Sequence, residues 1–236
     1  MPGRFHLSRR GLIVGAAAGL LGAPAFAEGD GHDDAPRPAL RPRAPRKAVA
    51  PPPAAAPADP AAGLSPEDAM ARLMAGNARY VADKATHPHL DPDYRRVVAG
   101  GQHPFATILA CADSRVAPEL IFDQGLGDLF VVRVAGNVVD DAVLASIEYS
   151  VIHLGSTLVM ALGHERCGAV KATIDALSGQ PSDEDRDTRI GALAALIAPA
   201  VQALPANAPD RLDAAVSLNA ANAAAEIFAG SRPLRS

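Results

Sequence analysis

The chain has 236 residues, which is enough for one domain of ordinary size with extensions. Hydrophobic residues make up 49% of it, so a sizeable core is expected, and that core should be aliphatic because tryptophan is absent. The formal net charge is −4, and residues 63–236 hold 14 basic and 21 acidic side chains. This balance argues against nucleic acid as a partner, because binding to phosphates needs clustered Lys and Arg.

Residues 1–27 are predicted to be a signal peptide. Basic residues precede an apolar run at 12–21, and Ala25-Phe26-Ala27 places small residues where a signal peptidase cuts. The pair Arg9-Arg10 before the run resembles the twin-arginine signal of bacteria, which carries folded proteins. An ordinary secretory signal and an uncleaved anchor are the alternatives, although the run is short for a membrane span. We therefore expect a periplasmic or secreted bacterial protein with no stable membrane span after processing.

Residues 28–62 are predicted to be a linker. They contain nine prolines and eleven alanines, so regular hydrogen bonding cannot persist, and little bulky apolar surface is available to offset the entropy of ordering. Mixed charges and three consecutive prolines at 51–53 favour an extended spacer. The folded domain should therefore comprise residues 63–236.

The domain should open with a helix from about residue 65 to about residue 80. Ser65 can cap it, and Pro66 suits its first position. Three apolar runs then have the length and branching of buried strands, at residues 105–110, 129–134 and 157–162. Helical patterns separate and follow them, at residues 141–154, 169–177, 188–204 and 210–229. This alternation predicts an α/β fold with a parallel β-sheet core flanked by helices, in which sites form at the carboxyl ends of the strands.

Two short motifs at such strand ends carry metal-ligand chemistry. CADSR (residues 111–115) follows the first predicted strand and HERCG (164–168) follows the third. Cys111, His164 and Cys167 together make a typical zinc shell of two thiolates and one imidazole, which leaves the fourth position open for water. A disulfide between the two cysteines is the alternative that an exported protein favours. Folding in the cytoplasm before export would allow zinc to bind first.

Asp113 has two possible roles, because it lies two residues from Cys111. It could be a further zinc ligand, or it could accept a hydrogen bond from zinc-bound hydroxide. Arg115 decides between them, since a bidentate pair with its guanidinium would draw the carboxylate away from the metal. Asp113 and Arg115 are therefore candidate catalytic residues, and Asp113 also remains a candidate metal ligand.

The two motifs, together with GDLFVVRVAGNVV (127–139) and IEYSVIHLG (147–155), resemble β-class carbonic anhydrases from about residue 64 to about residue 216. The resemblance implies that Cys111, His164 and Cys167 bind Zn²⁺, with Asp113 and Arg115 as the catalytic pair. It also implies the reversible hydration of carbon dioxide to bicarbonate and a proton, by attack of zinc-bound hydroxide.

The resemblance extends to a substrate pocket of Gln102, Phe130 and Tyr149. Aromatic walls suit a nonpolar gas, and an amide can donate to an oxygen on which negative charge develops. In the family this glutamine reaches the site across a dimer interface, so a homodimer or higher homo-oligomer is implied. Family members also continue into another strand at the sheet edge, whereas no β-branched run follows Ala229, so we expect the sheet to lack its C-terminal edge strand.

Two rival functions share these residues. The same shell could hydrolyse carbon disulfide or carbonyl sulfide, which are also linear triatomic molecules. The domain could instead be a non-catalytic zinc-binding module held by the linker. The access to the pocket and its width would separate the first rival from the main hypothesis, and turnover of carbon dioxide by zinc-loaded protein would separate the second.

Overall fold

The computed structural model describes residues 12–17, 63–180, 182 and 188–235. Its strands are β1 (Leu12–Ala17), β2 (Ala106–Ala110), β3 (Leu129–Arg133) and β4 (Leu158–His164). Its helices are α1 (Pro66–Val81), α2 (Pro92–Val98), α3 (Pro118–Ile121), α4 (Asp141–His153), α5 (Gly168–Leu177), α6 (Ile190–Gln202), α7 (Arg211–Gly230) and α8 (Arg232–Arg235), with a single 3-10 turn, η1 (Ala135–Asn137). The three strands and five helices predicted from the sequence are all present.

The strands form one parallel sheet in the order β1-β4-β2-β3. The central strand β2 is buried along its whole length, and its Leu109 pairs with Val132 on β3 and with Ala161 on β4. Because all strands run the same way, β2 and β4 end at the same edge of the sheet. The predicted α/β fold with a parallel core is confirmed.

The strand β1 was not predicted. It consists of Leu12–Ala17, which the sequence analysis assigned to the apolar run of a signal peptide, and it lies alongside β4 with Ala17 opposite His164. The position next to β4 is thus taken by a strand from the N-terminal part of the chain. The predicted linker and the other residues of the signal peptide lie outside the described residues.

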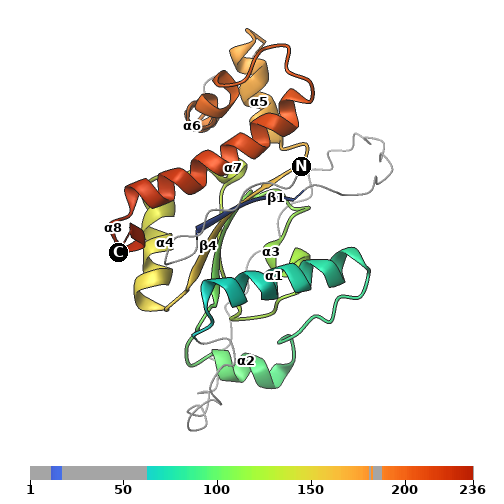
Figure 1. The fold of residues 1–236 in the computed structure, drawn as a ribbon, viewed down its shortest axis with the longest axis vertical. Coiled ribbons are helices and arrows are strands. Elements are labelled where there is room, and N and C mark those ends of the chain that lie inside the picture. Colours follow the sequence, from blue (N-terminus) through green and yellow to red (C-terminus); the bar gives the residue numbers. More distant parts are fainter. Residues whose placement is uncertain (1–11, 18–62, 181, 183–187, 236) are drawn as a thin grey trace, which may run out of the picture.

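Helices cover both faces of the sheet, with α1 on one side and α4 and α7 on the other (Figure 1). Neighbouring residues of each strand point to opposite faces, as Ile108 and Leu109 show. Ile108 packs in a cluster with Leu73 of α1 and Met160, whereas Leu109 packs with Ile147 of α4 and Ile227 of α7. A third cluster lies beyond the strand ends and joins Cys111, Cys167 and apolar residues of α5, α6 and α7.

Three short helices, α2, α3 and α8, were not predicted from the sequence, although local signals for α2 were present. α2 begins after Asp91, whose carboxylate accepts hydrogen bonds from the backbone N–H groups of Asp93 and Tyr94, and Pro92 occupies its first position. No residue of α2 is fully buried, so the apolar periodicity that identifies longer helices is missing. α3 is a single turn of four residues, too short to show any period.

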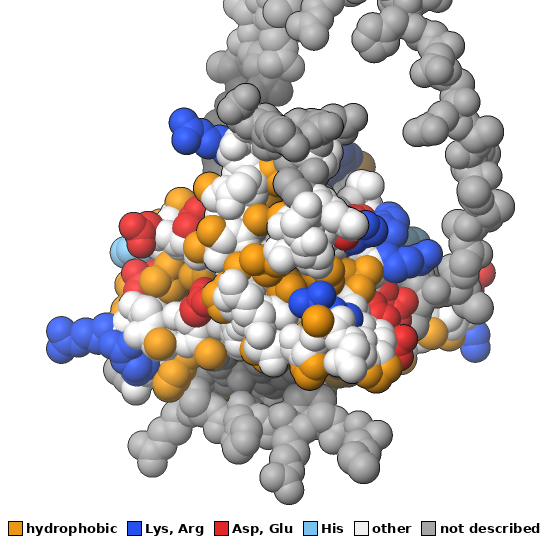
Figure 2. Space-filling view, turned by 90° about the horizontal axis from the view of Figure 1, so that it is seen from above, with side chains coloured by type: hydrophobic (Ala, Val, Ile, Leu, Met, Phe, Trp, Pro, Cys, Tyr) orange, Lys and Arg blue, Asp and Glu red, His pale blue; other side chains and the backbone are white. Residues whose placement is uncertain are grey.

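The described surface mixes side-chain types. In the view of Figure 2, basic and acidic side chains are interspersed with apolar ones. No described helix is both long enough and apolar enough to cross a membrane.

Candidate metal centre and active site

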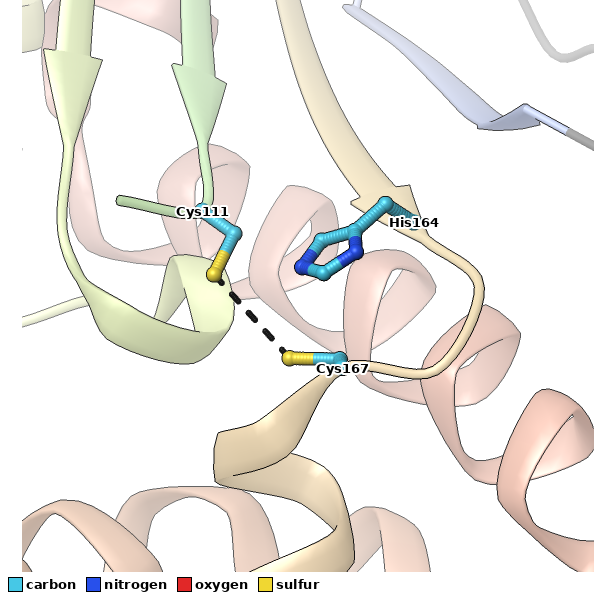
Figure 3. Close-up of side chains that lie close together, drawn as sticks. All are labelled: Cys111, His164 and Cys167. Atoms are coloured by element: carbon cyan, nitrogen blue, oxygen red, sulfur yellow. Dashed lines mark hydrogen bonds between the residues drawn. The ribbon is translucent and has the colours of Figure 1, made fainter. Parts of the chain in front are cut away.

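Three side chains from two turns converge at the carboxyl edge of the sheet (Figure 3). Cys111 directly follows β2, His164 is the last residue of β4, and Cys167 is the residue before α5. All three are buried, with exposed fractions of 4%, 5% and 2% respectively. The parallel sheet therefore brings Cys111 together with His164 and Cys167, which lie more than fifty positions further along the chain.

The two sulfur atoms and one ring nitrogen of this group lie within 4.8 Å of one another. The two Sγ atoms are 4.0 Å apart, twice the length of a disulfide bond, and both cysteines are free. Two sulfurs bound to one tetrahedral zinc ion lie about 3.8 Å apart, because each Zn–S bond is about 2.3 Å long. The alternative of a Cys111–Cys167 disulfide is therefore wrong for this structure, and the spacing fits a metal.

The imidazole of His164 is oriented for metal binding. Its Nδ1 lies 2.9 Å from the backbone carbonyl of Glu165, which can only accept a hydrogen bond, so Nδ1 carries the proton. Its Nε2 then offers a lone pair, yet this buried atom has no hydrogen-bond partner among the described residues. Buried polar atoms are rarely left unpaired, and metal-bound histidines commonly donate their other nitrogen to a carbonyl. The group therefore fits zinc.

The charges in the group also suit a cation. Hydrogen bonding to Cys167 lowers the pKa of Cys111 to about 4, with further help from His164 and from the backbone N–H of Gly136 at 3.2 Å. The same contact raises the pKa of Cys167. Contact with the Cys111 thiolate raises the pKa of His164. A divalent cation would be attracted by the negative charge of the thiolate and would favour loss of the proton from the second thiol.

Asp113 and Arg115 form a bidentate ion pair beside the group. Arg115 Nε donates to Asp113 Oδ1 at 2.8 Å and Nη2 donates to Oδ2 at 2.7 Å, and the Arg115 backbone N–H adds a third bond at 3.0 Å. These bonds hold the pKa of Asp113 well below its usual range. Asp113 Oδ2 lies 3.8 Å from His164 Nε2 and does not belong to the three-residue group. The structure thus shows the arrangement in which Arg115 draws Asp113 away from the ligand position.

Arg133 braces the turn that carries Cys111 and Asp113, and sequence reasoning missed it. This last residue of β3 donates from Nε to the Cys111 carbonyl at 3.0 Å and from Nη2 to the Asp113 carbonyl at 2.6 Å. Arg115 adds a longer bond of 3.3 Å to the carbonyl of Arg166, which joins the two ligand-bearing turns. The only signal in the sequence was a charged residue at the end of an apolar strand. That signal does not indicate which backbone groups the Arg133 side chain binds.

The three residues expected to line a substrate pocket are only partly brought together. Phe130 is half-buried on β3, Tyr149 is 50% exposed on α4, and their ring centroids lie 6.4 Å apart. Gln102 is exposed on the loop between α2 and β2, where it lines a shallow hollow of about 420 Å³ with Leu126 and Gly127. None of the metal-binding residues lines that hollow.

Comparisons with known proteins agree with this geometry. The model of the family described as carbonic anhydrase matches residues 106–230. Carbonic anhydrase 2 of Mycobacterium tuberculosis is 54% identical over 114 residues, which are 48% of this chain and 55% of the relative. The carbonic anhydrase of Mycolicibacterium smegmatis is 52% identical over 113 residues, with the same two shares. The chain therefore spans about half the length of the curated relatives it matches.

Solved structures show the same fold. The Coccomyxa β-carbonic anhydrase in complex with acetazolamide has a TM-score of 0.53 and 26% identity, and the match covers 70% of this chain and 74% of that one. A tetrameric β-carbonic anhydrase from Sordaria macrospora has a TM-score of 0.51 at 24% identity, covering 71% and 84%, and is alike in fold. The family match covers more than half of the chain and includes both ligand-bearing turns. The chain belongs to the carbonic anhydrase family, and its fold is that of the β class.

Proposed function

We propose that this chain catalyses the zinc-dependent, reversible hydration of carbon dioxide to bicarbonate and a proton. The observation that carries the proposal is the buried group of Cys111, His164 and Cys167, with the Asp113–Arg115 ion pair beside it. Zinc would be held by the two Sγ atoms and by His164 Nε2. When bound, zinc supplies a Lewis acid that allows a water molecule to lose a proton near neutral pH.

Asp113 would orient the attacking oxygen. Because Arg115 keeps the Asp113 carboxylate ionised, Asp113 can only accept a hydrogen bond, and it would accept one from the hydroxyl proton of the nucleophile. The oxygen lone pair is then directed away from Asp113, towards the carbon of carbon dioxide. The new C–O bond gives bicarbonate, and the proton that was lost in forming the nucleophile passes to buffer.

Phe130, Tyr149 and Gln102 would hold the substrate. The aromatic pair offers an apolar wall to carbon dioxide, and the Gln102 amide would donate to the oxygen that gains negative charge. Gln102 is exposed on its own protomer and lines a hollow away from the metal-binding residues. We therefore propose a homodimer or higher homo-oligomer in which Gln102 of one protomer completes the site of its neighbour. Exposed Met74 and Val81 on α1 are apolar surface that such an interface would cover.

We further propose export to the periplasm, with residues 1–27 as a twin-arginine signal and residues 28–62 as a tether. Removal of this signal would also remove β1 from the edge of β4. The support is the sequence pattern around Arg9 and Arg10. Replacing both arginines with lysine should leave folded, zinc-loaded protein in the cytoplasm. Normal accumulation in the periplasm would contradict the twin-arginine route.

The catalytic proposal is tested by stopped-flow measurement of carbon dioxide hydration with the zinc-loaded full-length chain. Turnover well above the buffer rate is expected, and an Asp141→Asn variant, altered at an exposed carboxylate of α4, should match the wild type. Hydrolysis of carbonyl sulfide or carbon disulfide without carbon dioxide turnover would contradict the proposal. So would tight zinc binding with no turnover of any of the three molecules.

A further inference from the structure

Asn219 is a buried amide on α7, in a helix face otherwise made of small apolar residues. Its exposed fraction is 5%, and its neighbours on that face include Ala215, Val216 and Ala223. An amide in such surroundings is unfavourable unless it is hydrogen bonded. Its Nδ2 donates to the backbone carbonyl of Gly136 at 2.7 Å, across 83 positions of the chain. A buried polar side chain therefore makes one specific long-range contact.

Gly136, which accepts the hydrogen bond from Asn219, also donates one to Cys111 Sγ, a proposed zinc ligand. The Gly136 backbone N–H donates to Cys111 Sγ at 3.2 Å, so one residue receives the Asn219 amide at its carbonyl and gives its own N–H to the sulfur. Three groups on α7, η1 and the turn after β2 are thus linked in series. We refer to Asn219, Gly136 and Cys111 as the amide relay.

The backbone at the centre of the relay is unusual enough to need external support. Gly136 has φ +70° and the next residue, Asn137, has φ +44°, so two consecutive residues adopt the left-handed region, which side chains other than asparagine and aspartate rarely enter. A Cβ on Gly136 would lie 2.6 Å from Ile197 Cδ1 on α6, so a side chain there would force the buried Ile197 to shift. The Asn219 bond and the packing of α6 therefore hold this turn in place from two sides.

We infer that Asn219 is a positioning residue of the metal centre. By holding the Gly136 carbonyl, it keeps the Gly136 N–H directed at Cys111 Sγ, and this fixes the direction in which the sulfur faces His164 and Cys167. The inference rests on the proposed zinc centre. Groups that support metal ligands in this way typically change metal affinity by about 10- to 100-fold when removed.

The test compares zinc affinity in full-length variants by competition with a chromogenic chelator. Asn219→Ala removes the amide, and Asn219→Leu removes the donor while keeping the volume. Either variant should bind zinc about tenfold more weakly or worse. Asn222→Ala is the matched control, because Asn222 is half-buried on the same helix three residues further on and takes no part in the relay.

Two spectroscopic measurements separate positioning from simple loss of stability. In cobalt-loaded protein, the sulfur-to-metal charge-transfer bands should shift in Asn219→Ala and stay unchanged in Asn222→Ala. In wild-type protein loaded with ¹¹³Cd, the Gly136 amide proton should show scalar coupling to the metal through the N–H···S bond, a readout that requires no variant to fold.

The outcomes distinguish this inference from the proposed function. A wild-type chain that binds no zinc overturns both. Stoichiometric zinc in the wild type, with unchanged affinity and unchanged cobalt bands in the Asn219 variants, overturns the positioning role alone. Absence of the cadmium coupling to Gly136 also overturns it.

Discussion

Arg115 holds the Asp113 carboxylate through both of its oxygens, at 2.8 Å and 2.7 Å. In the proposed mechanism this pairing separates the roles of two residues that stand only two positions apart, since Cys111 would bind the metal and Asp113 would orient the reacting oxygen. Asp113→Asn should therefore retain zinc while carbon dioxide hydration falls about 100-fold or more. The hydration rate of the Arg115→Ala variant should fall by a similar factor, because the freed Asp113 carboxylate can turn towards the metal. Stopped-flow rates at matched zinc content measure this, and unchanged rates in Asp113→Asn would remove Asp113 from the mechanism.

Arg133 should matter for activity although it binds neither metal nor substrate in the proposed mechanism. Its two bonds to the carbonyls of Cys111 and Asp113 fix the turn on which both side chains stand. Arg133→Ala should lower the hydration rate about tenfold or more, since small displacements of reacting groups are costly. Arg133→Lys should recover part of the rate, because lysine keeps a donor but loses the fork. Equal rates for wild type and Arg133→Ala would show that the turn is rigid without this brace.

Asp123 should make the fold sensitive to acid. Its side chain is fully buried, which opposes ionisation, but hydrogen bonds from the backbone of Thr86 and His87 and a 2.5 Å contact with Arg79 outweigh that effect and lower its pKa. Because the pKa is lower in the folded state, the stabilisation is fully present above about pH 4 and is lost as pH falls towards the folded-state pKa.

Asp123→Asn should therefore destabilise the fold by about 2 kcal/mol or more near pH 7, and by progressively less below about pH 4. Asparagine keeps the backbone compatible with φ +46° at this position. Asp83→Asn is a matched control, because Asp83 has φ +55° but is exposed. Urea unfolding measured between pH 7 and pH 3 tests this, and a destabilisation that does not change with pH would contradict the role of ionised Asp123.

The stability of the fold should depend on whether a strand pairs with the outer edge of β4. β1 lies along this edge, so a chain that begins at Glu28 would leave the β4 backbone groups on that side without the bonds that β1 supplies. We expect such a chain to melt at a lower temperature than the full-length chain, or to form a larger assembly, at matched zinc occupancy. A family-like strand added after the last helix should restore the melting temperature. Equal melting temperatures and equal masses in solution for all three chains would show that this edge needs no partner strand.

Sequence reasoning identified the three residues that converge in the structure, because each stands at the end of a buried strand or shortly after it, and parallel strands place such ends together. It could not find β1, because the residues of Leu12–Ala17 suit a signal peptide as well as a strand. It also missed Arg133 and Asn219. Both residues bind backbone carbonyls 20 to 83 positions away. Because every residue has a backbone carbonyl, the sequence does not indicate which one a side chain will bind.

Zinc titration of the metal-free, full-length chain, with carbon dioxide hydration followed at each addition, tests the central claim most directly. The hydration rate should rise in proportion to the zinc added and should stop rising at one zinc per chain. Cys111→Ser, His164→Ala and Cys167→Ser should neither hold zinc nor exceed the buffer rate, because each variant lacks one of the three atoms proposed to bind zinc. A rate that does not depend on zinc, or full zinc occupancy with normal turnover in any of the three variants, would contradict this claim.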